Sequence, residues 1–175
     1  TGNFVGYMVS VVLAGIIARS IGARWTISLG LFLVGSSMVF ISRAMGFLEV
    51  MILYAATGIG SGLANVPMMG LVSHWFLKSS RGRAAGFMLS GNGVAIVFAG
   101  LFIPWVNASK GAEGWRTGWL TIGAISLAIC AIAAFFLRNE PGDKGLIPIG
   151  ESETAPAPSG QNFKKEKNAN KWTMV

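Results

Sequence analysis

The residues best suited to chemistry form a polar row inside an otherwise apolar stretch. The row consists of Tyr54, Thr57, Ser61, Asn65 and Met68, spaced three or four positions apart. At 100° per residue on an α-helix, the whole row falls within an arc of about 80°. Hydroxyl and amide groups form hydrogen bonds without carrying a fixed charge. The row can therefore bind a neutral part of a partner, but it supplies no proton relay.

Two interpretations of this row stay open at the level of sequence. Polar side chains are costly in lipid unless they meet protein or water. The row therefore either forms hydrogen bonds between helices or lines an aqueous cavity that binds a small molecule. A shorter row of Asn3, Tyr7 and Ser10 allows the same two interpretations. For the cavity, the predicted substrate-binding residues are Tyr7, Tyr54, Thr57, Ser61 and Asn65.

Catalytic and metal chemistry find little support. Ser61 has Ile59 two positions before it, where the G-x-S-G motif of an intramembrane serine protease needs glycine. The single histidine, His74, follows Ser61 by 13 residues in the same predicted helix, and that spacing means roughly 20 Å. Cys130 is the only cysteine and lies in an apolar segment, so neither a disulfide nor a thiolate metal site is available. We predict no catalytic residue, no metal and no cofactor, and the chain is not expected to be an enzyme.

The stretches that carry these residues are long enough to cross a bilayer. The chain has 175 residues, 53% hydrophobic and only 12% charged, whereas soluble domains carry about 25% charged residues. Asp, Glu, Lys and Arg are absent from residues 1–18, 25–42, 50–77, 84–109 and 117–137. A bilayer requires about 20 apolar residues per helix, and no stretch alternates as a barrel strand would. We predict an all-α fold, a polytopic transmembrane helical bundle over residues 1–137, in contact with the lipid bilayer.

The distribution of basic residues predicts the orientation of the bundle. The first and third connections and the tail after residue 137 carry 11 of the 14 Lys and Arg residues, and the second and fourth connections carry 3. Connections rich in Lys and Arg stay in the cytoplasm. This topology accounts for the net charge of +7, and no basic patch interleaved with aromatics suggests a nucleic-acid partner.

Both ends of the chain point to further helices. Residue 1 would lie outside the membrane, so we expect a helix before it. Residues 138–175 contain four prolines and a basic run, and we predict a cytoplasmic, largely disordered connector leading to a further helix near Trp172. The expected partners thus include the missing helices of the same polypeptide.

Small residues predict where helices pack closely. Gly58 and Gly62 lie in the third stretch, and Gly91 and Ala95 lie four positions apart in the fourth. Small residues allow helix backbones to approach each other in membranes. We predict that these four residues pack against neighbouring helices.

Two connections carry motifs of a known family. Gly15, Gly22 and Arg24 match three positions of G-x-x-x-D-R-x-G-x-R, while Arg19 takes the Asp position and Ser20 the first Arg position. The second motif, W-F-x(4-5)-R-G-x-A-x-G, is matched by Trp75, Phe76, Arg81, Gly82, Ala84 and Gly86. The chain thereby resembles the major facilitator superfamily, in the branch that includes oxalate/formate and monocarboxylate carriers. Arg24, Arg81 and the glycines Gly15, Gly22 and Gly82 would be its cytoplasmic loop residues.

The resemblance implies an architecture and a function. The five stretches would be helices two to six, and the tail would be the central loop, so the chain would form half of a transporter. Helices one and four line the cavity in this family, which places the row from Tyr54 to Met68 on the cavity wall. The implied function is secondary active transport of a small solute, with organic anions favoured, by alternating access in the plasma membrane or bacterial inner membrane. The alternative is a membrane receptor or structural protein with the same fold and no net transport.

Overall fold

The computed structural model describes residues 2–139, and every regular element in that range is a helix. The elements are α1 (Gly2–Ile21), α2 (Ala23–Ile41), α3 (Phe47–Trp75), α4 (Arg81–Lys110), the short 3-10 helix η1 (Gly111–Glu113) and α5 (Gly114–Phe136). Residues 2–139 contain no strand, and the predicted all-α helical bundle is confirmed. The predicted connector and the helix near Trp172 fall on residues 140–175, outside the described part of the chain.

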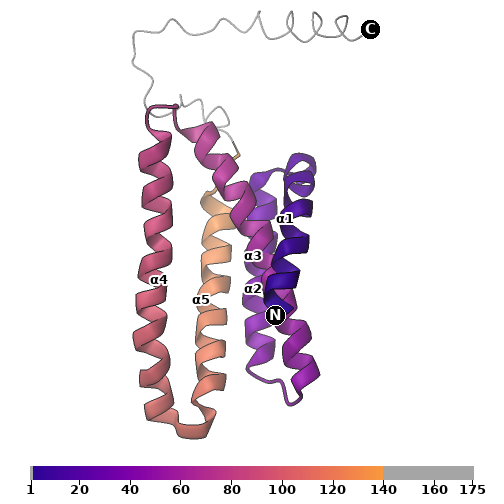
Figure 1. The fold of residues 1–175 in the computed structure, drawn as a ribbon, viewed down its shortest axis with the longest axis vertical. Helices are drawn as coiled ribbons and strands as arrows, with labels where there is room; N and C mark the ends of the chain where they lie inside the picture. The colour runs from indigo at the N-terminus through magenta and orange to yellow at the C-terminus, as the bar shows by residue number, and fades with distance from the viewer. Residues whose placement is uncertain (1, 140–175) are drawn as a thin grey trace, which may run out of the picture.

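Four stretches of helix in residues 2–139 are long and apolar enough to cross a membrane. They are Gly2–Ile21, Ala23–Ile41, Phe47–Trp75 and the continuous run Arg81–Phe136. The last run is a hairpin, because α4 and α5 lie side by side and are joined end to end through η1 (Figure 1).

The helices extend past the charge-free stretches predicted from the sequence. Arg19 lies in the last turn of α1, Glu49 in the first turn of α3 and Arg116 near the start of α5. A charge at the end of a span does not end the helix, because its side chain can reach the interface while the backbone continues. The exact limits of the membrane spans stay a prediction.

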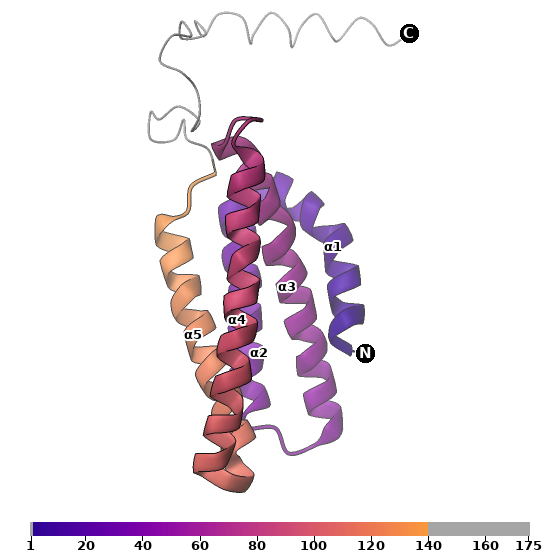
Figure 2. The same cartoon turned by 60° about the vertical axis from the view of Figure 1, so that its left-hand side comes forward.

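Helix α3 connects the parts of the bundle. It packs against both α1 and α2, while α2 also packs against α5, and α4 contacts mainly α5 (Figures 1 and 2). Contacts therefore run from α1 through α3, α2 and α5 to α4. This arrangement leaves α4 covered along one side only.

Glycines allow the helix backbones to touch where they cross. A Cβ on Gly60 of α3 would lie 2.6 Å from the carbonyl oxygen of Gly30 on α2, far too close for any side chain. On the other side of α3, Gly58 abuts the backbone of Asn3, and Gly62 abuts the side chain of Ser10. Helix association in lipid depends on such close van der Waals contact, since lipid tails are as apolar as the side chains.

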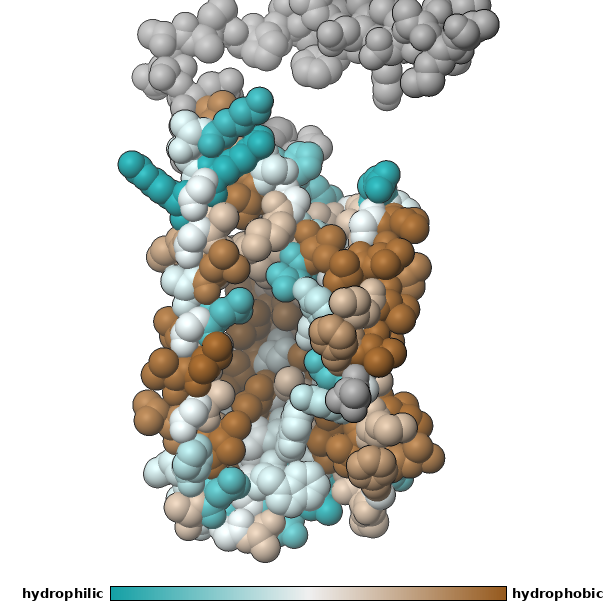
Figure 3. Space-filling model, viewed as in Figure 1, coloured by the Kyte–Doolittle hydropathy of each residue, from teal (hydrophilic) through white to brown (hydrophobic). Residues whose placement is uncertain are grey.

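Most large apolar side chains of residues 2–139 are exposed, and most of the buried side chains are small, with Ile27 and Ile41 as the largest that are fully buried. The buried side chains of residues 2–139 include Ser10, Ala14, Thr26, Ser28, Ser37 and Thr57. In contrast, Phe47 and Phe87 are each 84% exposed and Phe135 is 80% exposed. Hydrophobic atoms cover the flanks of the molecule in Figure 3. This distribution suits a surface surrounded by lipid and an interior built from close backbone contacts.

Two arginines join the ends of α2 and α5. Arg24, in the first turn of α2, donates from Nε to the carbonyl oxygen of Ala134 in the last turn of α5 at 2.9 Å, and its Nη2 contacts the same oxygen. Arg116, in the first turn of α5, donates to the carbonyl oxygen of Ser42, the residue that ends α2, at 3.1 Å. Carbonyls in the last turn of a helix lack intrahelical donors and favour a positive charge. Arg24 and Arg116 therefore hold the antiparallel helices α2 and α5 together at both ends.

The predicted packing of Gly91 and Ala95 is not found among residues 2–139. Nothing lies within 4 Å of the position of a Cβ on Gly91, and Ala95 is exposed. The reason is that α4 contacts mainly α5 and turns the middle of its small-residue face away from the other described helices.

Alanine at Gly58 should disrupt the contact between α1 and α3. Its methyl group would collide with the backbone of Asn3, and overpacking of this kind costs about 1–3 kcal/mol. We expect a lower midpoint for thermal unfolding of the full-length protein in detergent.

The matched control is Gly70→Ala on the same helix. No atom lies within 4 Å of its Cβ position, so this variant should unfold at the wild-type temperature or slightly above it. Equal midpoints for the two variants would contradict the close contact between α1 and α3.

Candidate functional site

The polar row of α3 is not uniform in the folded chain. Thr57 is only 2% exposed, and Ser61 is half-buried. Tyr54 is 41% exposed, and Asn65 is also exposed. The single arc predicted from the sequence therefore contains a covered part and an open part.

The covered part binds α1 to α3. Asn3 of α1 donates from Nδ2 to Oγ1 of Thr57 at 2.8 Å and to the carbonyl oxygen of Tyr54 at 3.3 Å. The Thr57 hydroxyl in turn donates to the carbonyl oxygen of Tyr54 at 2.7 Å. Thr57 thus uses its hydroxyl as both donor and acceptor within the bundle, which leaves it poorly placed to contact a solute.

Ser61 is also engaged, within its own helix. Its hydroxyl donates to the carbonyl oxygen of Thr57 at 2.8 Å. The oxygen of Ser61 can still accept a hydrogen bond, because a hydroxyl has two acceptor lone pairs. Ser61 is therefore intermediate between the covered and the open part of the row.

Tyr54 and Asn65 form the open part, and the half-buried Tyr7 of α1 lies beside Asn65. Asn65 donates from Nδ2 to the Tyr7 hydroxyl at 3.4 Å, which joins α3 to α1 across 58 positions of sequence. This bond is long, and it leaves the carbonyl oxygen of Asn65 and the hydroxyl proton of Tyr7 for another partner. The structure brings the predicted residues Tyr7 and Asn65 together.

Tyr54 meets an aromatic residue that the sequence did not single out. Its ring lies edge-on to the ring of Trp119 on α5, with centroids 6.0 Å apart and planes at 84°. Aromatic pairs prefer this geometry. A search for polar rows along one helix cannot find Trp119, because its span has no polar row. No signal in the sequence linked Trp119 to Tyr54.

One side of the described molecule is hollowed. Figure 3 shows a depression between α4 and the pair α1 and α3, with hydrophilic and pale residues gathered over its middle and hydrophobic residues on its flanks. Neutral groups predominate here, because no Asp, Glu, Lys or Arg occurs in residues 50–77. The site can offer hydrogen bonds and aromatic surface. Within residues 2–139, no group of His, Cys, Asp and Glu is arranged to hold a metal ion.

The first loop motif forms a tighter connection than the sequence suggested. Only Gly22 separates α1 from α2, with φ of 86°, a left-handed conformation that favours glycine. A Cβ on Gly22 would also lie 2.7 Å from Nδ2 of Asn139. Arg24 belongs to the first turn of α2, where its backbone N–H donates to Oδ1 of Asn139 at 2.8 Å. Gly15 lies inside α1 with open space around it.

The second loop motif ends α3. Arg81 donates from Nη2 to the carbonyl oxygen of Ser73 at 2.8 Å and from Nε to that of Phe76 at 3.0 Å. These carbonyls have no partner within the helix, so Arg81 acts as a cap that also fixes the turn into α4. Gly82, the next residue of the motif, has no atom within 4 Å of its Cβ position.

Comparison with known proteins adds a family and several relatives. The model of the "Major Facilitator Superfamily" matches residues 1–175. The chain is 24% identical over 149 residues to the membrane sensor protein UhpC of Salmonella typhimurium, covering 85% of the chain and 33% of that protein.

Two further relatives carry transporter names. Monocarboxylate transporter 14 of Homo sapiens is 26% identical over 164 residues, covering 88% of the chain and 31% of that protein. The probable sulfoacetate transporter SauU of Cupriavidus necator is 25% identical over 169 residues, covering 97% of the chain and 39% of that protein. The chain therefore spans between 31% and 39% of the length of these relatives.

Thr57→Val should weaken the bundle through the loss of its bond to Asn3. Hydrogen bonds between membrane helices contribute about 0.6 kcal/mol on average and up to about 1.7 kcal/mol. We expect a reduced fraction of folded full-length protein after heating in detergent, whereas Asn65→Leu should leave that fraction unchanged because Asn65 is exposed.

A double-mutant cycle with Asn3→Ala provides the control for this bond. The two effects should not add, because each variant removes the same interaction. Fully additive losses would show that Thr57 and Asn3 stabilise the bundle independently.

Proposed function

The chain belongs to the Major Facilitator Superfamily, and from this premise we propose that the full-length protein moves a small solute across the membrane by alternating access. The family and its transporter relatives support membrane transport of small solutes rather than catalysis. The observation that carries the finer proposal is that Tyr54 and Asn65 of the α3 row stay exposed, with Tyr7 of α1 beside Asn65. The relatives are about three times as long as the chain, so the remaining helices would complete the cavity.

The proposal assigns different roles to the residues of the α3 row. Tyr7, Tyr54 and Asn65 would contact the solute, and Ser61 would accept a hydrogen bond from it. Thr57 would act as a structural residue, because its hydroxyl is already used in both directions. Gly58 and Gly62 would keep α1 and α3 in contact while the bundle moves as one body.

An organic anion is the proposed substrate class. The names of two relatives refer to anions, a monocarboxylate and sulfoacetate. The charge-free stretches of this chain contain no Lys or Arg, so they hold no cation to pair with the anionic group. The residues described here would hold the uncharged part of the solute, and a cation elsewhere in the full-length protein would hold its charge.

The proposed orientation places the end of the bundle with Arg19, Arg81 and Arg83 in the cytoplasm. This follows from the excess of basic residues at that end. The membrane would be the plasma membrane or the bacterial inner membrane.

A sensor without net transport is the second candidate. The relative named a membrane sensor protein aligns with 85% of the chain. A sensor could use the same open polar group to bind its ligand, so the geometry of the site does not distinguish a sensor from a transporter. Exchange of the solute across the membrane distinguishes them, because only a transporter performs it.

Asn65→Leu and Tyr54→Phe should lower uptake by the full-length protein. Each variant removes a hydrogen-bonding group from the open part of the row, and a loss of about 1–2 kcal/mol of binding corresponds to roughly a 5- to 30-fold weaker affinity. Radiolabelled organic anions, taken up by cells with equal surface expression, provide the measurement.

Ile59→Leu is the matched control for these two variants. Ile59 lies on α3 and is 36% exposed, but its position is about 160° from the polar row on the helix. Normal uptake by Ile59→Leu is expected. Normal uptake by Asn65→Leu as well would refute the assignment of the open polar group to the solute.

Counterflow in liposomes should distinguish the transporter from the sensor. When the liposomes are preloaded with unlabelled solute, a transporter accumulates labelled solute from outside. The reason is that the binding site, each time it reopens to the outside, can exchange its unlabelled solute for a labelled molecule. We expect this transient accumulation with the wild-type full-length protein. Saturable binding without any accumulation would instead favour the sensor.

A further inference from the structure

A cavity lies on the side of α3 that faces away from Asn65. Its volume is about 360 Å³, within the range of about 300–1,000 Å³ common for small-ligand sites. Pro67, Gly70, Leu71 and His74 form its α3 wall. These positions lie on average about 190° from Asn65 around the helix, so the cavity is separate from the proposed solute site.

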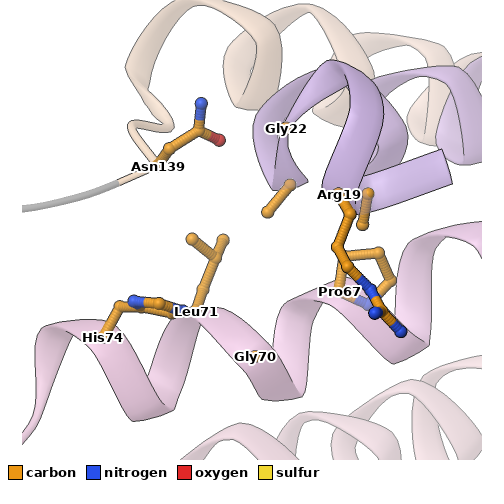
Figure 4. Close-up of a pocket in the computed structure, with 9 residues that line it drawn as sticks. Arg19, Gly22, Pro67, Gly70, Leu71, His74 and Asn139 are labelled. Carbon is orange, nitrogen blue, oxygen red and sulfur yellow. The ribbon is translucent and has the colours of Figure 1, made fainter. Parts of the chain in front are cut away.

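Three polar side chains from three segments surround this cavity. Figure 4 shows Arg19 of α1 and His74 of α3 near its two ends, with Asn139, which follows α5, on the far wall beside Gly22. Apolar atoms of Leu71 and Pro67 lie between them. The cavity thus combines an apolar floor with donor groups on its rim.

Asn139 is held in a defined orientation. Its Oδ1 accepts the backbone N–H of Arg24 at 2.8 Å, which leaves Nδ2 as its donor group. Gly22 lies against that amide, and the lack of a Cβ there is what makes room for it. The glycine of the first loop motif therefore shapes the wall of the cavity.

The charge around the cavity is positive and not balanced within residues 2–139. The basic residues at this end are Arg19, Arg24, Lys78, Arg81, Arg83 and Arg138. The only acidic residues in the described range are Glu49 and Glu113, and both lie at the opposite end of the helices, where α3 begins and where α4 joins α5. Glu49 accepts backbone N–H groups before α3, and Glu113 pairs with Arg116 at 3.3 Å.

Arg19 differs from its basic neighbours Arg24 and Arg81. Those two donate to carbonyl oxygens at the ends of α5 and α3. Arg19 donates only from Nε, to Gly15 at 3.3 Å, and its two terminal nitrogens make no hydrogen bond within residues 2–139. It is exposed at the cavity, so its planar pair of donors is available for an oxyanion.

We propose that this cavity binds a phosphate oxyanion, and that its source is the headgroup of an anionic lipid. Arg19 would donate to the phosphate oxygens, His74 and the Nδ2 group of Asn139 would donate to other oxygen atoms of the headgroup, and Leu71 and Pro67 would contact the start of the acyl chains. The position favours a lipid, because the cavity lies at the ends of membrane-spanning helices where headgroups lie. Basic pockets between helices on the cytoplasmic side are suited to anionic headgroups.

Native mass spectrometry of the full-length protein tests this assignment. The protein is extracted from bilayers of equal parts phosphatidylglycerol and phosphatidylcholine, and the retained lipids are counted. We expect selective retention of phosphatidylglycerol. The double variant Arg19→Gln, His74→Gln should retain at least fivefold less of it, with an unchanged unfolding midpoint, because both side chains are exposed.

The matched control is Lys78→Gln, Arg83→Gln. It removes two basic side chains at the same end of the bundle, neither of which lines the cavity. This variant should retain phosphatidylglycerol as the wild type does. Equal losses in the two double variants would show general attraction to the basic end and would overturn the proposal.

Inorganic phosphate distinguishes the two sources of the oxyanion. If a lipid is the ligand, phosphate at tens of millimolar should displace little phosphatidylglycerol. Complete displacement by phosphate, dependent on Arg19 and His74, would retain the oxyanion site but overturn the lipid as its source. This test requires no transport activity, so it succeeds or fails independently of the proposed function.

Discussion

The contact of helix backbones at glycine is the constraint on which the rest of the structure depends. Gly60 meets Gly30 on one side of α3, and Gly58 and Gly62 meet α1 on the other. Because lipid gives no hydrophobic driving force between helices, this close approach supplies the van der Waals contact that holds α1, α2 and α3 together. The interior is consequently built mainly from small residues, and most of the large apolar residues face outward.

The same contact decides which polar groups remain available. Where α1 lies against α3, the amide of Asn3 reaches Thr57, and that hydroxyl becomes part of the helix interface. Further along α3, Asn65 meets Tyr7 at 3.4 Å only and stays exposed. Helix packing and the proposed solute binding thus use different members of one row, and a change at Thr57 is expected to act on the fold before it acts on the solute.

The two ends of the bundle use their charges differently. Arg24, Arg81 and Arg116 donate to backbone carbonyls at the ends of α5, α3 and α2, so they are structural cations. At the end rich in arginine, Arg19 keeps two donors beside a cavity that no described acidic residue neutralises. In this chain Arg19 occupies the position where the family motif has Asp, and this reversal of charge underlies the proposed binding of an anion in the cavity.

The sequence by itself determined the helical class, the polar row and the family, since these follow from apolar length, helical period and short motifs. Helical period fixes the angles between residues on one helix, but not which neighbour covers each side. Only the tertiary structure therefore decided that Thr57 is covered while Asn65 is open, that Trp119 meets Tyr54, and that Gly91 and Ala95 have no described neighbour. The tertiary structure also showed that Gly22 alone connects α1 and α2. Glycine favours the positive φ found there, but the presence of a glycine does not by itself require that conformation.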